Sequence, residues 1–240
     1  MLAGKRCAVV ASSGFLKNRR LGSYIDNFDF IARCNIWTFD NSQSLDLGSR
    51  CDFWYGRPLV QHLKLKLETF NENYIKLLCL LPRTKEGWEH WDEDHSKFLN
   101  EYNHLKFNYR VIDVDEYLQF EEKLSSVPYT GILAIHDLLL NGAAEVHAIG
   151  FDFYKSGYSH SVPVGRTNTF NGRHDLIACQ KYLWELIKNE PRFKCDYHLQ
   201  SILEKIFKPT FKRNASKLVK ILDSEIHQFC DEFKEDNILI

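Results

Sequence analysis

The chain has 240 residues, enough for one large α/β domain with a small helical appendage. Its 31 basic and 32 acidic side chains nearly balance, so the total charge does not predict a nucleic acid or another polyanion as partner. No apolar stretch has the length of a transmembrane helix or the pattern of a signal peptide. The seven cysteines are scattered without a Cys-x-x-Cys pair, which predicts reduced thiols in place of disulfides or a zinc site.

Short apolar runs alternate with polar or helical stretches, a pattern typical of a parallel sheet with crossover helices. Helices are predicted over residues 131–140, with Thr130 as the N-cap, over residues 174–189, and over the acidic residues 86–102. Seven runs are predicted to be strands: residues 7–11, 28–34, 51–55, 74–81, 109–114, 145–150 and 193–197.

Two further stretches bear on the domain organisation. Residues 162–172 contain two glycines, two asparagines and a proline, and are predicted to form a long mobile loop that covers an active site. Two helices are expected from residue 199 onward, so we predict a catalytic domain over 1–198 and a helical extension over 199–240 packed on it. The six basic residues between 205 and 220 either face solvent or rest on an anionic membrane or a phosphate-bearing acceptor.

Polar residues follow the first three predicted strands. Ser12, Ser13 and Gly14 end the first strand in a turn that lets backbone N–H groups and hydroxyls approach a ligand closely. Such turns are common, and the absence of a G-x-G-x-x-G fingerprint argues against a nicotinamide or flavin enzyme. Asn35 ends the second strand, where its amide suits a base edge or a sugar hydroxyl, or else caps a turn. The third strand ends at the Tyr55-Gly56 pair.

A third polar cluster lies later in the chain. Thr130 and Gly131 open a predicted helix, and the free N–H groups and positive dipole end of a helix suit a phosphate or a carboxylate. The strand predicted over 145–150 then leads into Phe151, Asp152 and Tyr154. From the residues alone we therefore expect an α/β sheet with a site for a nucleotide and an anion.

In this order the three clusters resemble the sialylmotifs of animal-type sialyltransferases. The large motif is similar to residues 6–14, 30–35 and 46–50, and the small motif to residues 128–133 and 145–151. The run Gly-Phe-Asp-Phe-Tyr at 150–154 also resembles the compact bacterial sialyltransferases. The resemblance covers residues 5–185 and implies a single Rossmann-like domain of the GT-A-variant glycosyltransferase fold, with a mainly parallel twisted sheet and helices on both faces.

The resemblance also implies a reaction: inverting, metal-independent transfer of sialic acid from CMP-sialic acid to a glycan hydroxyl. His174 matches the histidine that acts as general base, a role that needs a group titrating near neutral pH. His160, with Tyr154 and Tyr158, is expected to donate to the departing phosphate. The residues expected to bind the donor are Ser12, Ser13, Gly14, Asn35, Tyr55, Gly56, Thr130, Gly131, Phe151 and Asp152.

The chain departs from the family pattern at three places. A serine replaces the asparagine usual in the first turn, which leaves a hydroxyl as the donor. Cys179 and Gln180 stand where the family carries a glutamate after its histidine, which puts in doubt what that carboxylate would orient. Cys7 lacks the cysteine with which secretory members pair it, since residues 141–144 contain none. The last departure favours a cytoplasmic enzyme, peripheral at most to the inner face of a membrane.

Two alternatives stay open. The transferred sugar is either sialic acid or Kdo or another CMP-activated ulosonic acid, because these donors share the cytidine, the phosphate and the anomeric carboxylate. A chain that lacks the glutamate could also bind CMP without catalysis. The expected partners are a CMP-sugar donor and a glycan acceptor, lipid-linked and capsular oligosaccharides included, together with a membrane contact through the basic C-terminal helices and a homo-oligomer. No nucleic acid is expected.

Overall fold

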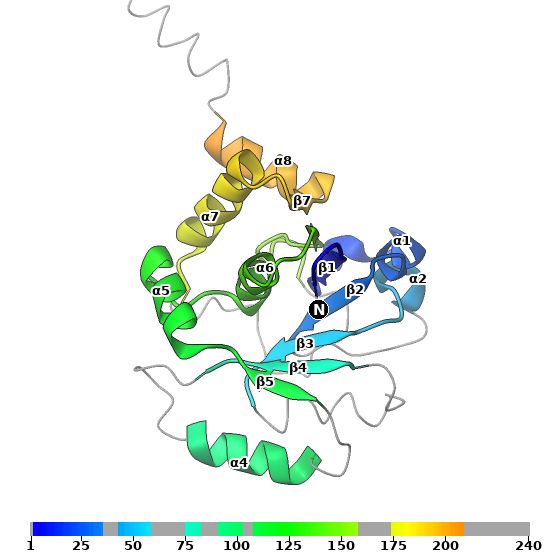
Figure 1. Ribbon diagram of the computed structural model, residues 1–240. Helices are drawn as coiled ribbons and strands as arrows, with labels where there is room; N and C mark the ends of the chain where they lie inside the picture. The colour runs from blue at the N-terminus through cyan, green and yellow to red at the C-terminus, as the bar shows by residue number, and fades with distance from the viewer. Residues whose placement is uncertain are drawn as a thin grey trace, which may run out of the picture. The chain divides into compact units, whose positions relative to one another are not determined.

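Seven parallel strands form a single sheet in the computed structural model of the chain (Figure 1). The structure describes residues 2–35, 43–58, 75–82, 91–102, 108–157 and 174–208. The sheet order is β5-β4-β3-β2-β1-β6-β7, and the seven predicted strands are confirmed to within a few residues at their ends. The strands are β1 (Arg6–Val10), β2 (Phe30–Cys34), β3 (Phe53–Gly56), β4 (Leu77–Leu80), β5 (Tyr109–Val111), β6 (Glu145–Ile149) and β7 (Phe193–Cys195).

The helices predicted over 86–102, 131–140 and 174–189 correspond to α4, α6 and α7, and α8 lies where the first of the two helices after residue 199 was expected. Helices α1, α2 and α5 were not expected from the sequence. The prediction of Thr130 as N-cap is wrong: Tyr129 is the N-cap, and Thr130 is the first helical residue. The helices are α1 (Gly22–Asp26), α2 (Ser44–Leu47), α4 (Trp91–Tyr102), α5 (Val114–Leu124), α6 (Thr130–Leu140), α7 (Leu176–Asn189) and α8 (Tyr197–Phe207), with the 3-10 turn η1 (Gly14–Leu16) after β1.

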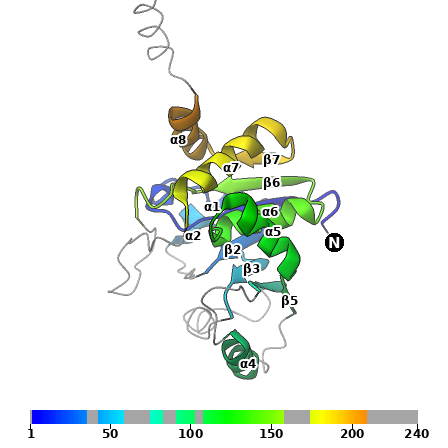
Figure 2. The same ribbon diagram turned by 90° about the vertical axis from the view of Figure 1, so that its left-hand side faces the viewer.

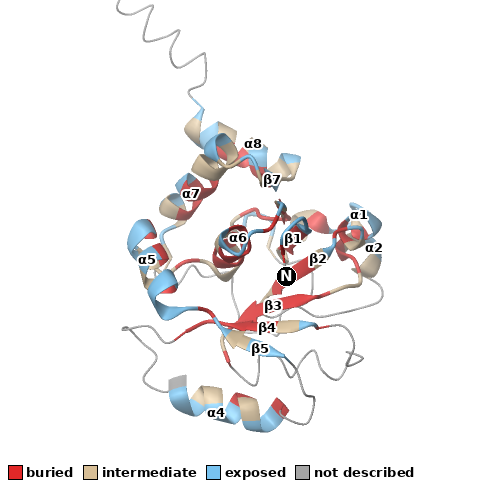
Figure 3. Ribbon diagram, viewed as in Figure 1, coloured by how far each residue is buried: buried red, intermediate tan, exposed pale blue. Residues whose placement is uncertain are grey.

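Helices cover both faces of the sheet, as expected. Helix α6 lies against the central strands β1, β2, β3 and β6 on one face, with α5 and α7 on the same side (Figures 1 and 2). Helices α1 and α2 lie on the other face, where Ile25 and Leu47 pack with Ala8, Ile31 and Ile149 of the strands. The central strands are consequently the most buried part of the structure (Figure 3), which explains why they read as near-continuous apolar runs.

The order of the strands fixes where a ligand can bind. The chain runs outward from β1 to β5 and then returns through α6 to place β6 on the other side of β1. In open α/β sheets the crevice at such a reversal, outside the carboxyl ends of the strands, is the usual binding site. We therefore expect the site between the segments that follow β1 and β6.

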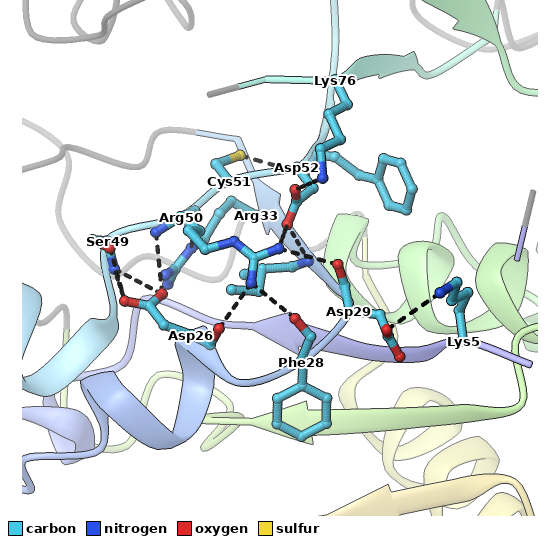
Figure 4. A network of polar contacts seen from close by, with 12 residues as sticks. Lys5, Asp26, Phe28, Asp29, Arg33, Ser49, Arg50, Cys51, Asp52 and Lys76 are labelled. Carbon is cyan, nitrogen blue, oxygen red and sulfur yellow. Dashed lines mark hydrogen bonds and ion pairs between the residues drawn. The ribbon is translucent and has the colours of Figure 1, made fainter. Parts of the chain in front are cut away.

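The amino end of the sheet, opposite to that crevice, is closed by a ladder of charged residues (Figure 4). Asp29 and Asp52 precede β2 and β3, and each accepts the backbone N–H of a neighbouring strand, from Arg6 at 2.8 Å and from Ile31 at 2.9 Å. Lys76 pairs with Asp52 at 2.7 Å. The two carboxylates thus accept hydrogen bonds from backbone N–H groups that would otherwise lack a partner. The charged residues at the amino end of the sheet therefore stabilise the fold.

The same end of the sheet contains Arg33, Ser49 and Arg50 of the large motif. The Asp26 carboxylate accepts the Ser49 N–H and hydroxyl, each at 2.8 Å. Arg50 donates to the carbonyl oxygens of Asp26 and Phe28 at 2.8 and 2.9 Å (Figure 4). Arg33 is fully buried and donates to the Arg50 carbonyl at 3.1 Å; its burial lowers the pKa of the guanidinium to about 10. These residues hold the start of the sheet together.

The chain divides into two compact units, Met1–Gln200 and Ser201–Ile240. The described part of the second unit is residues 201–208, in which Lys208 pairs with Glu204 at 2.8 Å. The helical extension predicted over 199–240 lies mostly outside the described residues and stays a prediction. Within the described ranges, no helix combines the length and the apolar character needed to cross a bilayer.

Candidate active site

Two turns meet at the carboxyl ends of β1 and β6. The Gly14 N–H donates to the carbonyl oxygen of Gly157 at 2.8 Å. A β-carbon on Gly14 would lie 2.3 Å from the carbonyl oxygen of Ser156, so no larger residue fits there without moving the backbone. The glycine that the sequence places in the first turn is therefore required for the contact between the two turns.

The segment 150–157, which we call the β6 turn, is held by a buried carboxylate. Asp152 is 2% exposed, accepts the Ser156 N–H at 2.9 Å and also accepts the Ser156 hydroxyl. The same hydroxyl oxygen accepts the N–H of Phe15 at 2.7 Å. Asp152, predicted to bind the donor, thus acts on the first turn through Ser156, a residue that sequence reasoning missed because 141 residues separate it from Phe15.

The β6 turn contains unusual backbone conformations. Phe153 and Tyr154 have φ angles of 56° and 64°, in the left-handed region that side chains other than glycine rarely adopt. Such conformations persist where surrounding contacts enforce them, and they concentrate at functional sites. Phe151 lies at the start of the turn with its ring against α6, where a β-carbon on Gly131 would lie 2.7 Å from a ring carbon. The turn is therefore fixed against both β1 and α6.

Asn35 and Thr130 meet at the site, as their sequence positions suggested. The Asn35 amide donates to the Thr130 hydroxyl at 3.1 Å, and the Asn35 N–H donates to the Tyr55 carbonyl at 2.8 Å. Asn35 has a φ of 51°. The structure thus joins the end of β2 to the first turn of α6, whose outward N–H groups favour an anion.

The Tyr55 side chain lies away from the site although its backbone belongs to it. Its hydroxyl donates to the buried Asp137 of α6 at 2.6 Å, and Arg110 also pairs with that carboxylate. Burial raises the pKa of Tyr55 well above its usual value. Gly56 follows, where a β-carbon would lie 2.4 Å from the Trp54 ring. A donor could therefore contact the backbone of this pair, while the Tyr55 hydroxyl is committed to the core.

His174 lies just before α7 with a defined orientation. Its Nδ1 is 2.7 Å from the carbonyl oxygen of Val127, and its ring stacks on Tyr129 with a centroid distance of 4.3 Å. A carbonyl oxygen can only accept, so Nδ1 carries the proton and the neutral ring has its lone pair on Nε2. Tyr129 in turn contacts the Tyr154 ring at 5.8 Å. The histidine is thus connected to the β6 turn by a row of rings.

The residues after β1 differ in burial. Ser12 is partly buried, whereas Ser13 is 6% exposed, and its hydroxyl has no hydrogen-bond partner among the described residues. A buried hydroxyl without a partner is costly, which is consistent with a ligand partner there. Tyr158 and His160, like the loop predicted over 162–172, lie outside the described residues.

The described residues offer no evident metal centre. Two Asp-x-Asp runs occur in the chain, at 92–94 and 113–115, and both lie at helix starts. Asp113 is the N-cap of α5 and accepts the N–H groups of Asp115 and Glu116 at 2.9 and 3.0 Å. In the described part of the chain, no group of three or more His, Cys, Asp or Glu side chains could hold a metal ion.

The N-terminal third of the chain matches known enzymes in sequence. Residues 2–86 match the model of glycosyltransferase family 29 (sialyltransferase). An alpha-N-acetylneuraminide alpha-2,8-sialyltransferase of Xenopus tropicalis is 36% identical over 74 residues, 29% of this chain and 21% of that protein. Human alpha-2,8-sialyltransferase 8E is 33% identical over 75 residues, 31% of this chain and 20% of that protein. The matched region therefore spans about a fifth of these relatives.

Solved structures match over most of the chain. A mammalian sialyltransferase in complex with Gal-beta-1-3GalNAc-ortho-nitrophenol has a TM-score of 0.51 and 22% identity, covering 80% of this chain and 69% of that one. The sialyltransferase CstII from Campylobacter jejuni, in complex with the substrate analogue CMP-3FNeuAc, has a TM-score of 0.52 and 15% identity, covering 80% and 81%. At such low identity, the structural similarity shows the fold alone, and it confirms the expected GT-A-like α/β architecture. The chain is thus similar to glycosyltransferase family 29 (sialyltransferase) in sequence over residues 2–86, and to solved sialyltransferases in fold over most of its length.

Proposed function

We propose that the chain transfers sialic acid from CMP-sialic acid to a hydroxyl group of a glycan. The observation that carries the proposal is the orientation of His174, whose Nδ1 donates to the Val127 carbonyl, which puts the lone pair of the neutral ring on Nε2. The ring row through Tyr129 and Tyr154 connects this histidine to the β6 turn, which contacts the Gly14 turn. The sequence match to sialyltransferases includes the Gly14 turn, within residues 2–86.

In the proposed reaction Nε2 of His174 takes the proton of the acceptor hydroxyl as its oxygen attacks the anomeric carbon. The bond from that carbon to the CMP phosphate oxygen breaks with its electron pair on the phosphate, and attack from the opposite face inverts the configuration. The phosphate is stabilised by side-chain donors and not by a metal, with Tyr154, Tyr158 and His160 proposed for this role. The first turn of α6, at Thr130 and Gly131, is the proposed site for the donor's carboxylate.

The region after His174 has no carboxylate that could replace the family's glutamate. Cys179 is fully buried, and its burial raises the pKa of the thiol to about 11, so it stays neutral. Gln180 is 4% exposed and cannot ionise. Asp175 is the N-cap of α7 and accepts the Ala178 N–H at 2.9 Å. We infer that His174 is positioned by Val127 and Tyr129 in place of an acidic partner.

The relatives' names suggest an acceptor class. Several are named as alpha-2,8-sialyltransferases, and one name gives alpha-N-acetylneuraminide, itself a sialic acid, as the acceptor. We propose that this chain likewise extends a glycan that ends in an acidic sugar. Its location in the cytoplasm and its contact with a membrane stay predictions, tested by cell fractionation with and without the extension 199–240.

The experiment that tests the proposal is CMP release by the purified full chain, with CMP-sialic acid and CMP-Kdo as alternative donors and EDTA present or absent. We expect release from CMP-sialic acid, unaffected by EDTA, and loss of release in His174→Asn. Asn can still donate to the Val127 carbonyl, so CMP binding and thermal stability should persist in this variant. CMP binding without release from either donor by the wild type would instead favour the non-catalytic alternative.

A further inference from the structure

A group of four basic residues borders the two turns of the candidate site. Lys17, Arg19 and Arg20 follow η1 on the way to α1, and Lys155 lies in the β6 turn beside Ser156. All four are exposed, and within the described ranges none of them makes an ion pair. We call this group the basic rim. Unpaired cations gathered at the ligand-binding edge of a sheet raise the local concentration of anionic substrates.

The loop that carries the rim is held in one shape. Asn18 and Arg20 have φ angles of 64° and 54°, in the left-handed region. The carboxylate of Asp46 accepts both of their N–H groups, each at 2.7 Å. This clamp fixes the loop, and the single negative charge of Asp46 leaves the surface positive. The loop is therefore organised before any ligand arrives, which lowers the entropic cost of binding.

Within the rim, the Arg19 side chain is held against Phe15. Its guanidinium carbon lies 4.5 Å from the centroid of the Phe15 ring, and its Nε donates to the Phe15 carbonyl at 3.3 Å. The Phe15 ring stacks on His198 with a centroid distance of 3.7 Å. The two terminal NH₂ groups of Arg19 have no partner among the described residues. A planar guanidinium held in this way presents two parallel donors, the geometry that binds a carboxylate in a bidentate manner.

We propose that the basic rim, with Arg19 at its centre, binds the carboxylate of an acidic sugar at the end of the acceptor glycan. This inference rests on the proposed function and adds the residues that select the acceptor. The site proposed above for the donor's carboxylate, at the first turn of α6, is separate, because α6 lies on the opposite face of the sheet from α1, into which the rim loop leads (Figures 1 and 2). The exposed rim is open to a long glycan, whereas Ser13 and Asp152 are buried.

The test compares sialyllactose and lactose as acceptors, using the full chain and CMP-sialic acid as donor. In Arg19→Glu we expect the KM for sialyllactose to rise about tenfold, as for loss of a charge-assisted hydrogen bond. Arg19→Lys keeps the charge but loses the planar fork, and should raise this KM about threefold. The matched control is Lys181→Glu, a charge reversal at an exposed residue of α7, which should leave both acceptors unaffected. Added salt should raise the KM for sialyllactose more than the KM for lactose.

The failures of the two proposals can be told apart. Equal changes in KM for sialyllactose and lactose, or a change in the KM of the donor alone, would overturn the rim as an acceptor site. If the wild type releases no CMP, the proposed function fails, and the rim is then judged by NMR titration with sialyllactose. Equal affinity of sialyllactose for the wild type and for Arg19→Glu would reject the basic rim as its binding site. Loss of binding to phosphatidylserine vesicles in Arg19→Glu, with sialyllactose affinity unchanged, would also reject it.

Discussion

The backbone N–H of Phe15 and the side-chain hydroxyl of Ser156 form a 2.7 Å hydrogen bond that joins the turn after β1 to the turn after β6. The hydroxyl also donates to the buried Asp152, so a single side chain links a strand end, a strained turn and a carboxylate. The turn after β1, which is proposed to bind the donor, therefore depends on Ser156, a residue that need not touch the donor.

Ser156→Ala should loosen this link. The variant leaves the Phe15 N–H without its partner and removes one of the two hydrogen bonds that Ser156 donates to the Asp152 carboxylate, a cost of about 1–3 kcal/mol in unfolding free energy. We expect weaker CMP binding and a lower melting temperature, measured by calorimetry and thermal denaturation. Ser23→Ala, at an exposed position of α1, is the matched control and should change neither. Unchanged CMP affinity in a destabilised Ser156→Ala would show that the link supports the fold only.

The rate of CMP release should depend on a base that titrates near neutral pH. The Val127 carbonyl holds the proton on Nδ1 of His174, so the neutral ring has its lone pair on Nε2, and protonation of Nε2 removes the lone pair that would take the acceptor's proton. We expect kcat/KM to fall on the acidic side of the profile, and His174→Asn to lower it by about 10²–10⁴. A His174→Asn variant that retained the acidic limb would assign the limb to another group.

Stability should also decline in acid, through partly buried histidines. His136 lies 2.9 Å from the Tyr182 hydroxyl and stacks on Phe120, and its pKa lies below the usual 6.5 because of burial, reinforced by the charge of Lys123. The unfolded chain therefore binds the proton more readily than the folded one. The contribution of the neutral His136 ring to the free energy of unfolding is complete above about pH 6.5, and it is lost as the pH falls through the pKa of the folded state.

The measurement is urea denaturation between pH 7.5 and pH 5. We expect the free energy of unfolding to fall with pH, by up to about 1.4 kcal/mol per pH unit for one such group. Burial lowers the pKa of His95 and His147 as well, so part of the slope should remain in His136→Gln. A slope identical to that of the wild type would exclude His136 as a contributor.

The buried cluster beneath α6 should be sensitive to loss of its carboxylate. Asp137 is 2% exposed and binds both Tyr55 and Arg110. Asp137→Ala would leave the Arg110 guanidinium without its counter-charge, and such losses cost about 3–5 kcal/mol. Chemical denaturation should show this, with the exposed Asp115→Ala as a control that changes stability by less than about 1 kcal/mol. Equal effects of the two substitutions would contradict the role given to Asp137.

The sequence predicted the sheet well because its central strands are buried on both faces and read as apolar runs. It predicted α5 poorly: Val111, Ile112 and Val114 looked like the continuation of a strand, whereas the Asp113 cap starts a helix there. Helices α1 and α2 have five and four residues, too few for a periodic pattern. Periodicity reports long elements and misses short ones.

The site was predictable only in part. The order of the strand ends indicated that Gly14, Asn35 and Thr130 belong to one region, and the structure joins Asn35 to Thr130. The roles of Ser156 and Asp46 were not predictable, because each acts on backbone groups far away in the sequence. The direction of the Tyr55 side chain could not be predicted either. Alternate residues of a strand face opposite sides of the sheet, and the sequence does not say which side holds the ligand.

The charged ladder at the amino end of the sheet has an evolutionary consequence. Asp26, Arg33 and Arg50 belong to the region that matches the family model, yet their hydrogen bonds are made to the protein's own backbone and side chains. Selection for folding alone would preserve them. If the proposed function holds, inactive descendants of this fold would therefore keep these residues while losing His174, and active and inactive descendants would be told apart at the carboxyl end of the sheet.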